Sequence, residues 1–334
     1  MKKLICIFFI VISLSGFSQQ RLLTKRIIYT VEFVESEIQS SAQKDSIVYN
    51  YIVNKRFFWE AMDELISKLK NKKLYLTSFR GDTIQWDTVF YDLTKQLNIL
   101  DSKKYSKKDV EKTLENEIRA IKFMEEWTYD PNTMLVTKKI NAYCPIVKRD
   151  TISLIGDELK GANAFVFELG WIRQKEAKPS ENALLLTRNI QYTMPIYNPK
   201  PYSWWDSNLE AEYSVPFFDM LFDKTEKSHI ECWESPDAVQ PLLKNEIEKR
   251  KKHSVSTTIV REVGDDDIIQ SDTSITMSYT ADDIDHLRFG EEILFDKGNL
   301  TFYKNVNYFA PTVRIFLAGG EFIGFYPIYY IRKR

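Results

Sequence analysis

The feature that most constrains the fold is a stretch of sequence that occurs twice, 166 residues apart. Residues 121–145 and residues 287–311 align without a gap. The shared positions are Phe123/Phe289, Glu125/Glu291, Glu126/Glu292, Asp130/Asp296, Lys138/Lys304, Asn141/Asn307 and Pro145/Pro311. A match of this length in one constant register indicates a repeated structural unit.

Three further blocks recur in the same order. They are LLTKRIIYT at 22–30 with LLTRNIQYT at 185–193, Phe57-Phe58 with Phe217-Phe218, and residues 105–110 with residues 279–284. The order predicts a tandem duplication, with repeat one in residues 19–175 and repeat two in residues 185–334. The polar segment around Lys178-Pro179-Ser180 is typical of a linker. We expect the two copies to pack against each other as two lobes.

The local patterns within a repeat predict an α+β fold. Apolar residues recur at helical spacing in residues 56–70, which predicts an amphipathic helix that covers a sheet. Ser106 and Thr280 are predicted helix N-caps, each followed three residues later by an aspartate. Strands are expected near 22–33, 46–53 and 73–79. We therefore expect each repeat to hold a mostly antiparallel sheet, a long β-hairpin and two covering helices.

The repeated hairpin places one carboxylate on an otherwise apolar face. Period-two alternation puts Glu125 in a row with Phe123 and Trp127, and Glu291 occupies the same place in the second copy. If Pro131-Asn132 and Lys297-Gly298 form two-residue turns, Glu125 faces Lys138 and Glu291 faces Lys304. We therefore predict a structural ion pair within each hairpin. A catalytic Glu125 would instead need a second carboxylate or base nearby, a raised pKa and a cleft.

Composition restricts both the compartment and the classes of partner. Residues 1–18 have two lysines, an apolar run and small residues at the end, which is typical of a cleaved secretory leader. The mature chain would hold 44 basic and 47 acidic residues, a balance that does not indicate a nucleic-acid partner. No later segment is apolar for long enough to span a membrane. Cys144 and Cys232 lie in apolar stretches, so we expect buried free thiols.

The remaining candidate residues indicate contacts with partner proteins and not catalysis or metal binding. Three dispersed histidines do not make a zinc motif, and no nucleophile elbow, phosphate loop or dinucleotide fingerprint is present. We therefore predict no catalytic residue, no cofactor and no metal. Trp204 and Trp205 are candidate partner contacts beside prolines. Tyr326, Ile328 and Tyr330 alternate in the last strand, which could pair with a partner edge.

The first repeat resembles the GldN (PorN) family of gliding motility and type IX secretion proteins. The matching segments are Asn54–Trp59 with Met62-Asp63-Glu64, Lys73–Thr77, Ile121–Asp130 and Ile140–Pro145. The likeness covers about half of the chain. It is looser in the second repeat, where Ile293 stands in place of Trp127. The family implies a periplasmic component that joins a ring of lipoprotein partners under the outer membrane and carries no catalytic residues.

These observations together predict an exported, non-enzymatic scaffold or adaptor of a cell-envelope assembly. It would be peripheral to the membrane, with envelope proteins or further copies of itself as partners. The alternative is a periplasmic glycan-binding module or glycoside hydrolase. A cleft with two facing carboxylates and aromatic platforms would favour that alternative.

Overall fold

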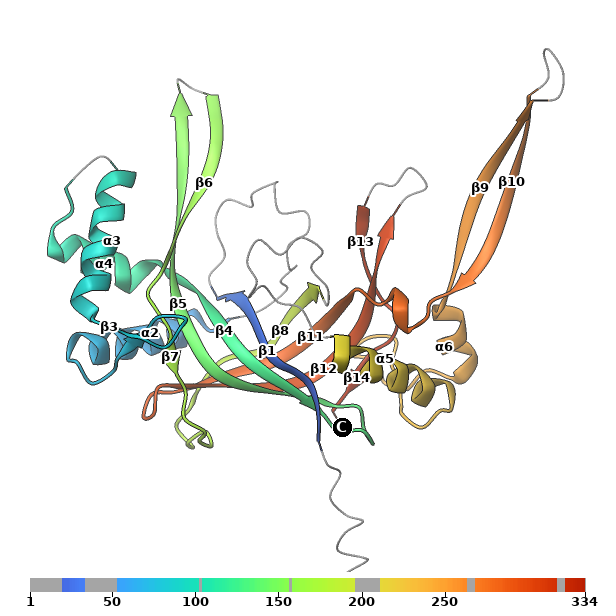
Figure 1. Cartoon of the computed structure of the whole chain (residues 1–334), viewed down its shortest axis with the longest axis horizontal. Helices are drawn as coiled ribbons and strands as arrows, with labels where there is room; N and C mark the ends of the chain where they lie inside the picture. Colours follow the sequence, from blue (N-terminus) through green and yellow to red (C-terminus); the bar gives the residue numbers. More distant parts are fainter. Residues whose placement is uncertain are drawn as a thin grey trace, which may run out of the picture.

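The computed structural model describes residues 20–33, 53–101, 104–155, 158–195, 211–262, 268–316 and 322–333. The predicted leader, most of the predicted strand at 46–53, and Trp204-Trp205 lie outside these ranges. The described part is a mixed α+β structure with two curled antiparallel sheets, as the sequence predicts for the fold class (Figure 1).

The first sheet has the strand order β1-β4-β5-β6, and a short strand, β7, also pairs with β5. Its strands are β1 (Arg21–Glu32), β4 (Ile118–Tyr129), β5 (Val136–Ile155), β6 (Glu158–Glu168) and β7 (Ile172–Arg173). The second sheet has the order β8-β11-β12-β13, and β14 pairs with β12. Its strands are β8 (Leu184–Pro195), β11 (His286–Asp296), β12 (Thr301–Phe316), β13 (Phe322–Pro327) and β14 (Ile331–Arg332). The two sheets thus have the same order of strands along the chain.

Helices lie beside both sheets (Figure 1). In the first half these are α2 (Lys55–Lys70), α3 (Trp86–Leu100) and α4 (Lys107–Glu117). The second half has α5 (Ala211–Glu226), α6 (Lys244–Arg250) and the 3-10 turn η1 (Ala281–Asp283). Helix α2 confirms the predicted amphipathic helix, and Asn54 caps it by accepting from Phe57 N. The helix buries Phe58, Ala61, Met62, Leu65, Ile66 and Leu69.

Ser106 is the predicted cap of α4: Asp109 N donates to its hydroxyl, and Ser106 N donates to the Asp109 carboxylate. At η1 the Thr280 amide and hydroxyl both donate to the Asp283 carboxylate, and the Thr280 hydroxyl makes no cap hydrogen bond with the first turn. The sequence patterns did not reveal α3. They also missed the ribbon of β9 (Lys252–Glu262) and β10 (Ile268–Ser278), which projects from the second half (Figure 1). The predicted strand at 73–79 is reduced to β2 (Leu76–Thr77), which pairs with β3 (Thr83–Ile84).

The helices are exchanged between the halves. Helix α2 packs against β8 of the second sheet, and α5 packs against β1 of the first. Val53 forms a bridge with Thr187 of β8, and Asn54 N donates to the Leu186 carbonyl at 2.8 Å. Each half therefore contributes a helix that packs against an edge strand of the other half.

One apolar core joins the two sheets. Residues from both halves belong to a single buried cluster, in which ring centroids of Phe123 and Phe302 lie 5.4 Å apart. Trp127 and Phe289 make a similar contact at 5.0 Å. Because these contacts cross between the sheets, the two halves share their main core. Two small buried clusters lie apart from it, one in each half.

The two central hairpins have the same turn. Asp130 accepts from Asn132 N and Asp296 accepts from Gly298 N, both at 2.8 Å. Four residues after each aspartate the backbone takes a positive φ, 58° at Met134 and 55° at Leu300. Neither residue is a glycine, so this conformation carries a steric cost in both hairpins.

Candidate functional site

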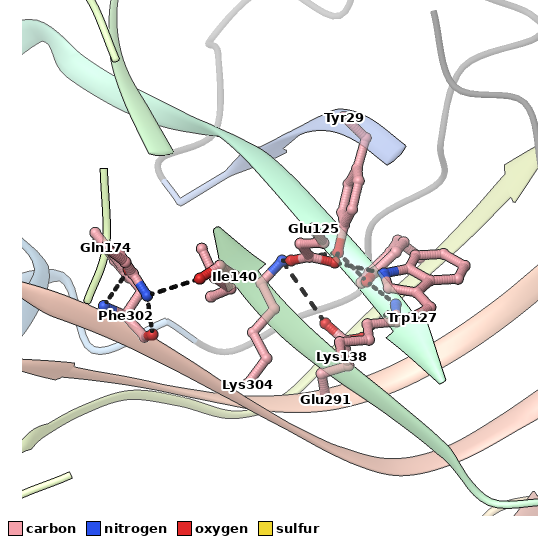
Figure 2. A network of polar contacts seen from close by, with 10 residues as sticks. Tyr29, Glu125, Trp127, Lys138, Ile140, Gln174, Glu291, Phe302 and Lys304 are labelled. Atoms are coloured by element: carbon pink, nitrogen blue, oxygen red, sulfur yellow. Dashed lines mark hydrogen bonds and ion pairs between the residues drawn. The ribbon is translucent and has the colours of Figure 1, made fainter. Parts of the chain in front are cut away.

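The most unusual site in the described structure is a set of charges buried between the two sheets. We call it the charge cluster: Glu125, Lys138, Glu291 and Lys304 (Figure 2). Tyr29 and Tyr192 lie beside these four residues. Both glutamates and both lysine side chains are fully buried. Ionised groups leave water at a large cost unless they are paired, so their pairing determines what the cluster does.

Each lysine pairs with a glutamate of the other half. Lys138 Nζ lies 2.5 Å from Glu291 Oε1, and Lys304 Nζ lies 2.8 Å from Glu125 Oε1. A longer contact of 4.0 Å joins Lys304 to the second oxygen of Glu291. The sequence predicted that Glu125 pairs with Lys138 and Glu291 with Lys304, each within one hairpin, and these partners are wrong. The same four residues do form buried ion pairs, but with partners from the other half.

The hairpin register explains the correction. In the structure Lys138 stands opposite Trp127, and Glu125 stands opposite Ile140. The second hairpin places Lys304 opposite Ile293 and Glu291 opposite Val306. The turn is longer than two residues, which shifts the pairing of Glu125 and Lys138 by two positions and leaves both side chains on their predicted face. The lysines therefore still point into the core, where the opposite sheet supplies their carboxylates.

The two tyrosines connect the pairs at the centre of the cluster. Tyr29 donates to Glu125 Oε2 at 2.7 Å and lies 2.9 Å from the Tyr192 hydroxyl. Lys304 donates to Tyr29 at 2.8 Å, and Lys138 donates to Tyr192 at 2.7 Å. Because Tyr29 has one hydroxyl proton and gives it to Glu125, Tyr192 is the donor between the two phenols.

Aromatic rings surround both ammonium groups. Lys138 Nζ lies 3.3 Å from the ring centroid of Phe289, and Lys304 Nζ lies 3.6 Å from that of Phe123. These two phenylalanines are equivalent repeat positions, and each contacts the lysine of the other half. Lys138 also lies 4.0 Å from the Trp127 ring. Such cation–π contacts partly replace the hydration that the lysines lose.

The two halves of the cluster differ in hydrogen bonding. Glu125 Oε2 also accepts from Trp127 Nε1 at 2.7 Å, whereas the position equivalent to Trp127 is Ile293. Burial raises the pKa of Glu125, but Lys304 and Lys138 outweigh burial and hold that pKa below its usual value. Burial lowers the pKa of Lys138 to about 8, against the opposing effect of Glu291 and Glu125.

The cluster is suited to holding the two sheets together, because both of its short ion pairs cross between them. Two carboxylates and two ammonium groups give it no net charge. A lowered Glu125 pKa keeps this group ionised, whereas a general acid needs a raised pKa. All four groups are sealed from solvent, so a substrate has no access to them in this structure.

A second polar contact joins the sheets near the linker (Figure 2). The Gln174 side chain donates to the carbonyls of Ile140 and Phe302 at 3.3 and 3.1 Å, and accepts from Phe302 N at 2.8 Å. Tyr143 donates to the Leu300 carbonyl at 2.7 Å. Sequence reasoning missed Gln174, because only the fold brings its side chain to backbone groups of both sheets.

The predicted partner contacts at the C-terminal end are only partly on the surface. Ile328 and Tyr330 are buried, so the prediction that they contact a partner is wrong. The chain turns inward after β13: Ile328 N donates to the Pro311 carbonyl, and Tyr330 forms a bridge with Trp233. Tyr326 is half-buried, with the Arg250 guanidinium 5.7 Å from its ring. Trp204 and Trp205 lie outside the described residues.

Cys144 and Cys232 are free and buried, as predicted. Burial raises the pKa of both thiols to about 12, which keeps them protonated. Among the described residues, no three His, Cys, Asp or Glu side chains are grouped in a way that could hold a metal ion. The helices of the same part of the chain are all too short or too polar to cross a bilayer.

Two open grooves adjoin each other on the helices of the first half. One, of about 500 Å³, is lined by Lys70, Trp86, Asp87, Phe90, Tyr91, Thr94, Lys107 and Glu111. The other, of about 650 Å³, is lined by Trp59, Asp63, Ile66, Ser67, Lys70, Asn71, Glu115 and Asn116. In the second groove burial and then Glu115 raise the pKa of Asp63. Sequence reasoning missed the first groove because α3, which lines it, was not recognised.

No protein-family model matches this chain. No curated protein matches it either.

Proposed function

We propose that the protein is a non-enzymatic structural component, a scaffold or adaptor, of a cell-envelope assembly. The observation that carries this proposal is the exchanged charge cluster, in which the most deeply buried ionisable groups neutralise each other between the sheets. Buried charges that pair with each other stabilise the fold. The proposed function then depends on the surface that the folded protein presents to its partners.

The sequence supports the compartment and the kind of assembly. Residues 1–18 read as a secretory leader, which supports export to the periplasm. Residues 121–129, part of the resemblance to the GldN family, lie in strand β4 (Ile118–Tyr129), which pairs with β1 and β5 inside the first sheet. We therefore propose gliding-motility or type IX secretion machinery as the assembly, and outer-membrane lipoproteins as partners.

We also propose that the chain arose by tandem duplication of residues 19–175 and 185–334. The shared strand order supports this, as do the equivalent turns at Asp130 and Asp296. Each sheet also has a register shift at the same place in its central hairpin, next to Glu125 in one and Glu291 in the other. The short last strands of the two halves also pair in the same way. Strand β7 (Ile172–Arg173) and strand β14 (Ile331–Arg332) pair with equivalent residues of β5 and β12.

Affinity purification from envelope fractions tests the proposed assembly. A tag after Arg334 is used to recover the chain, and co-purifying proteins are identified by mass spectrometry. The proposal predicts outer-membrane lipoproteins in the recovered complex. Recovery of the protein alone, at the mass of a monomer, would contradict it.

A second candidate function, glycan binding, is favoured by the groove between α2 and α4. There Asp63 and Glu115 are close enough for Glu115 to raise the Asp63 pKa, and Trp59 lines the same groove. Trp86 lines the adjoining groove. Aromatic faces with nearby polar groups are suited to sugar rings as amphipathic ligands.

Titration with chitotetraose, followed by tryptophan fluorescence and calorimetry, tests the second candidate. Saturable binding that is lost in Trp59→Ala but kept in the exposed control Ile99→Ala would support a glycan site in the groove between α2 and α4. Equal signals from both variants, or no heat of binding, would remove the candidate and leave the scaffold proposal untouched.

A further inference from the structure

Most carboxylates on helices α2 and α4 have a partner, and two do not. The paired ones are Glu60 with Lys297, Glu64 with Lys68, Glu111 with Lys70, Glu117 with Arg149, and Asp109 with Ser106. For Asp63 of α2 and Glu115 of α4, the described part of the chain supplies neither an ion pair nor a hydrogen bond. Both side chains are exposed, so a ligand can reach them.

The two unpaired carboxylates line one groove. This groove between α2 and α4 has a volume of about 650 Å³, and Trp59 and Ile66 form its apolar part. Burial raises the pKa of Asp63 and Glu115 raises it further, so the two like charges act on each other. Lys70 also lines the groove and lowers that pKa, but its Nζ lies 3.7 Å from Glu111. The groove therefore holds uncompensated negative charge beside a tryptophan.

This combination is complementary to a cationic side chain. A cation between two carboxylates removes their repulsion, and the face of an indole ring attracts the same cation. Arginine suits such a site best, because its planar guanidinium stacks on aromatic rings and donates to carboxylates through several N–H groups. A neutral sugar would leave the repulsion between Asp63 and Glu115 in place.

We propose that the groove between α2 and α4 binds an arginine side chain from a basic segment of a partner protein. The guanidinium stacks on Trp59 and donates to Asp63 and Glu115. The identity of the partner as an envelope protein rests on the proposed scaffold function. Recognition of the arginine side chain is a property of the groove alone.

Calorimetric titration of the full chain with N-acetyl-tetraarginine amide tests the groove. Binding should be saturable in about 0.05 M NaCl, where exposed charges are weakly screened. N-acetyl-tetraglutamate amide is the matched peptide of opposite charge and should give no heat of binding. Absence of saturable binding by the arginine peptide would overturn the proposal.

Single substitutions locate the binding site. Asp63→Asn and Glu115→Gln should each lower the association constant at least about fivefold, because each removes a charged hydrogen-bond acceptor. Asp92→Asn on α3 removes the same charge from an exposed residue that lines neither groove, and should bind as the wild type does. Circular dichroism verifies that the three variants fold. Groove variants that bind as well as the Asp92 variant would show attraction to overall charge, and would overturn the proposal.

Chitotetraose distinguishes an arginine site from a glycan site. The proposal predicts that the arginine peptide binds in the groove and that this neutral sugar does not compete with it. A groove that binds the sugar and not the peptide would overturn the proposal in favour of the glycan candidate. If the peptide binds as predicted but the chain is recovered alone from envelope fractions, the scaffold proposal fails and the arginine site stands.

Discussion

At the scale of single residues, Lys138 is a member of the charge cluster whose pKa lies well below its usual value. Burial lowers its pKa to about 8, while Glu291 and Glu125 act in the opposite direction. Its usual value in an unfolded chain is about 10.4. The neighbouring phenols, Tyr29 and Tyr192, have pKa values raised by burial and by the glutamates, so they stay neutral in this range.

The Lys138 pKa predicts that the protein becomes more stable between pH 8 and pH 10. In this interval the unfolded chain holds a proton on Lys138 that the folded chain has lost, so the free energy of unfolding rises with pH. The rise should be on the order of 1–2 kcal/mol. Urea titrations of the wild type and of Lys138→Met measure it, and the methionine variant should lack it. A wild-type curve parallel to that of the variant would show that Lys138 does not titrate there.

The sequence allowed the four charged residues to be chosen but not paired. Alternation along residues 121–130 was enough to place Glu125 on the buried face, and the repeat then gave Glu291. Pairing failed because the turn was taken as two residues. The extra length depends on positive φ values at Met134 and Leu300, and no glycine in the sequence marks these positions. A hairpin considered alone also contains no information about the sheet that faces it.

At the scale of elements, equivalent strand pairs have exchanged large and small side chains. Gly290 of β11 stands opposite Tyr308 of β12, where the first sheet has Met124 opposite Ala142. A Cβ on Gly290 would lie 2.0 Å from the Tyr308 ring, so the tyrosine requires the glycine. In the first sheet the larger side chain of this pair is Met124 of β4, and the smaller one is Ala142 of β5.

This exchange predicts a rescue. Gly290→Ala alone should destabilise the protein by about 1–3 kcal/mol through overpacking, and Tyr308→Ala alone by about 3–5 kcal/mol through a cavity. The double variant should lose less unfolding free energy than the two single variants lose when added together, because alanine at 308 removes the clash. Chemical denaturation of the three variants measures the coupling. Strict additivity would show that the two side chains do not compete for one space.

Elements with strong local signals were predicted well, and the insertions were not. Helix α2 and the capping box of α4 follow from spacing and from short polar motifs. Helix α3 was missed although Val89, Leu93 and Leu97 recur at every fourth position, because this stripe is narrow. The β9–β10 ribbon lies before η1, where the first half has β2, β3 and α3 before α4, so the repeat gave no guide to it.

At the scale of the whole molecule, the exchange of helices and charges predicts a single unfolding unit. The common core and the covers of β1 and β8 require both halves at once. Unfolding monitored by far-UV circular dichroism and by tryptophan fluorescence should therefore give coincident transitions. Two separate transitions, or an intermediate with one half folded, would show that the halves are independent domains.

The central claim is that the buried charges hold the two sheets together by crossing between them, and double-mutant cycles test it most directly. One cycle combines Glu125→Gln with Lys304→Met, the pair at 2.8 Å, and a matched cycle combines Glu125→Gln with Lys138→Met of the same hairpin. The structure predicts a coupling energy of about 2 kcal/mol or more in the first cycle and a clearly smaller one in the second. A larger coupling between Glu125 and Lys138 would mean that the charges pair within each hairpin, and would contradict the exchanged cluster.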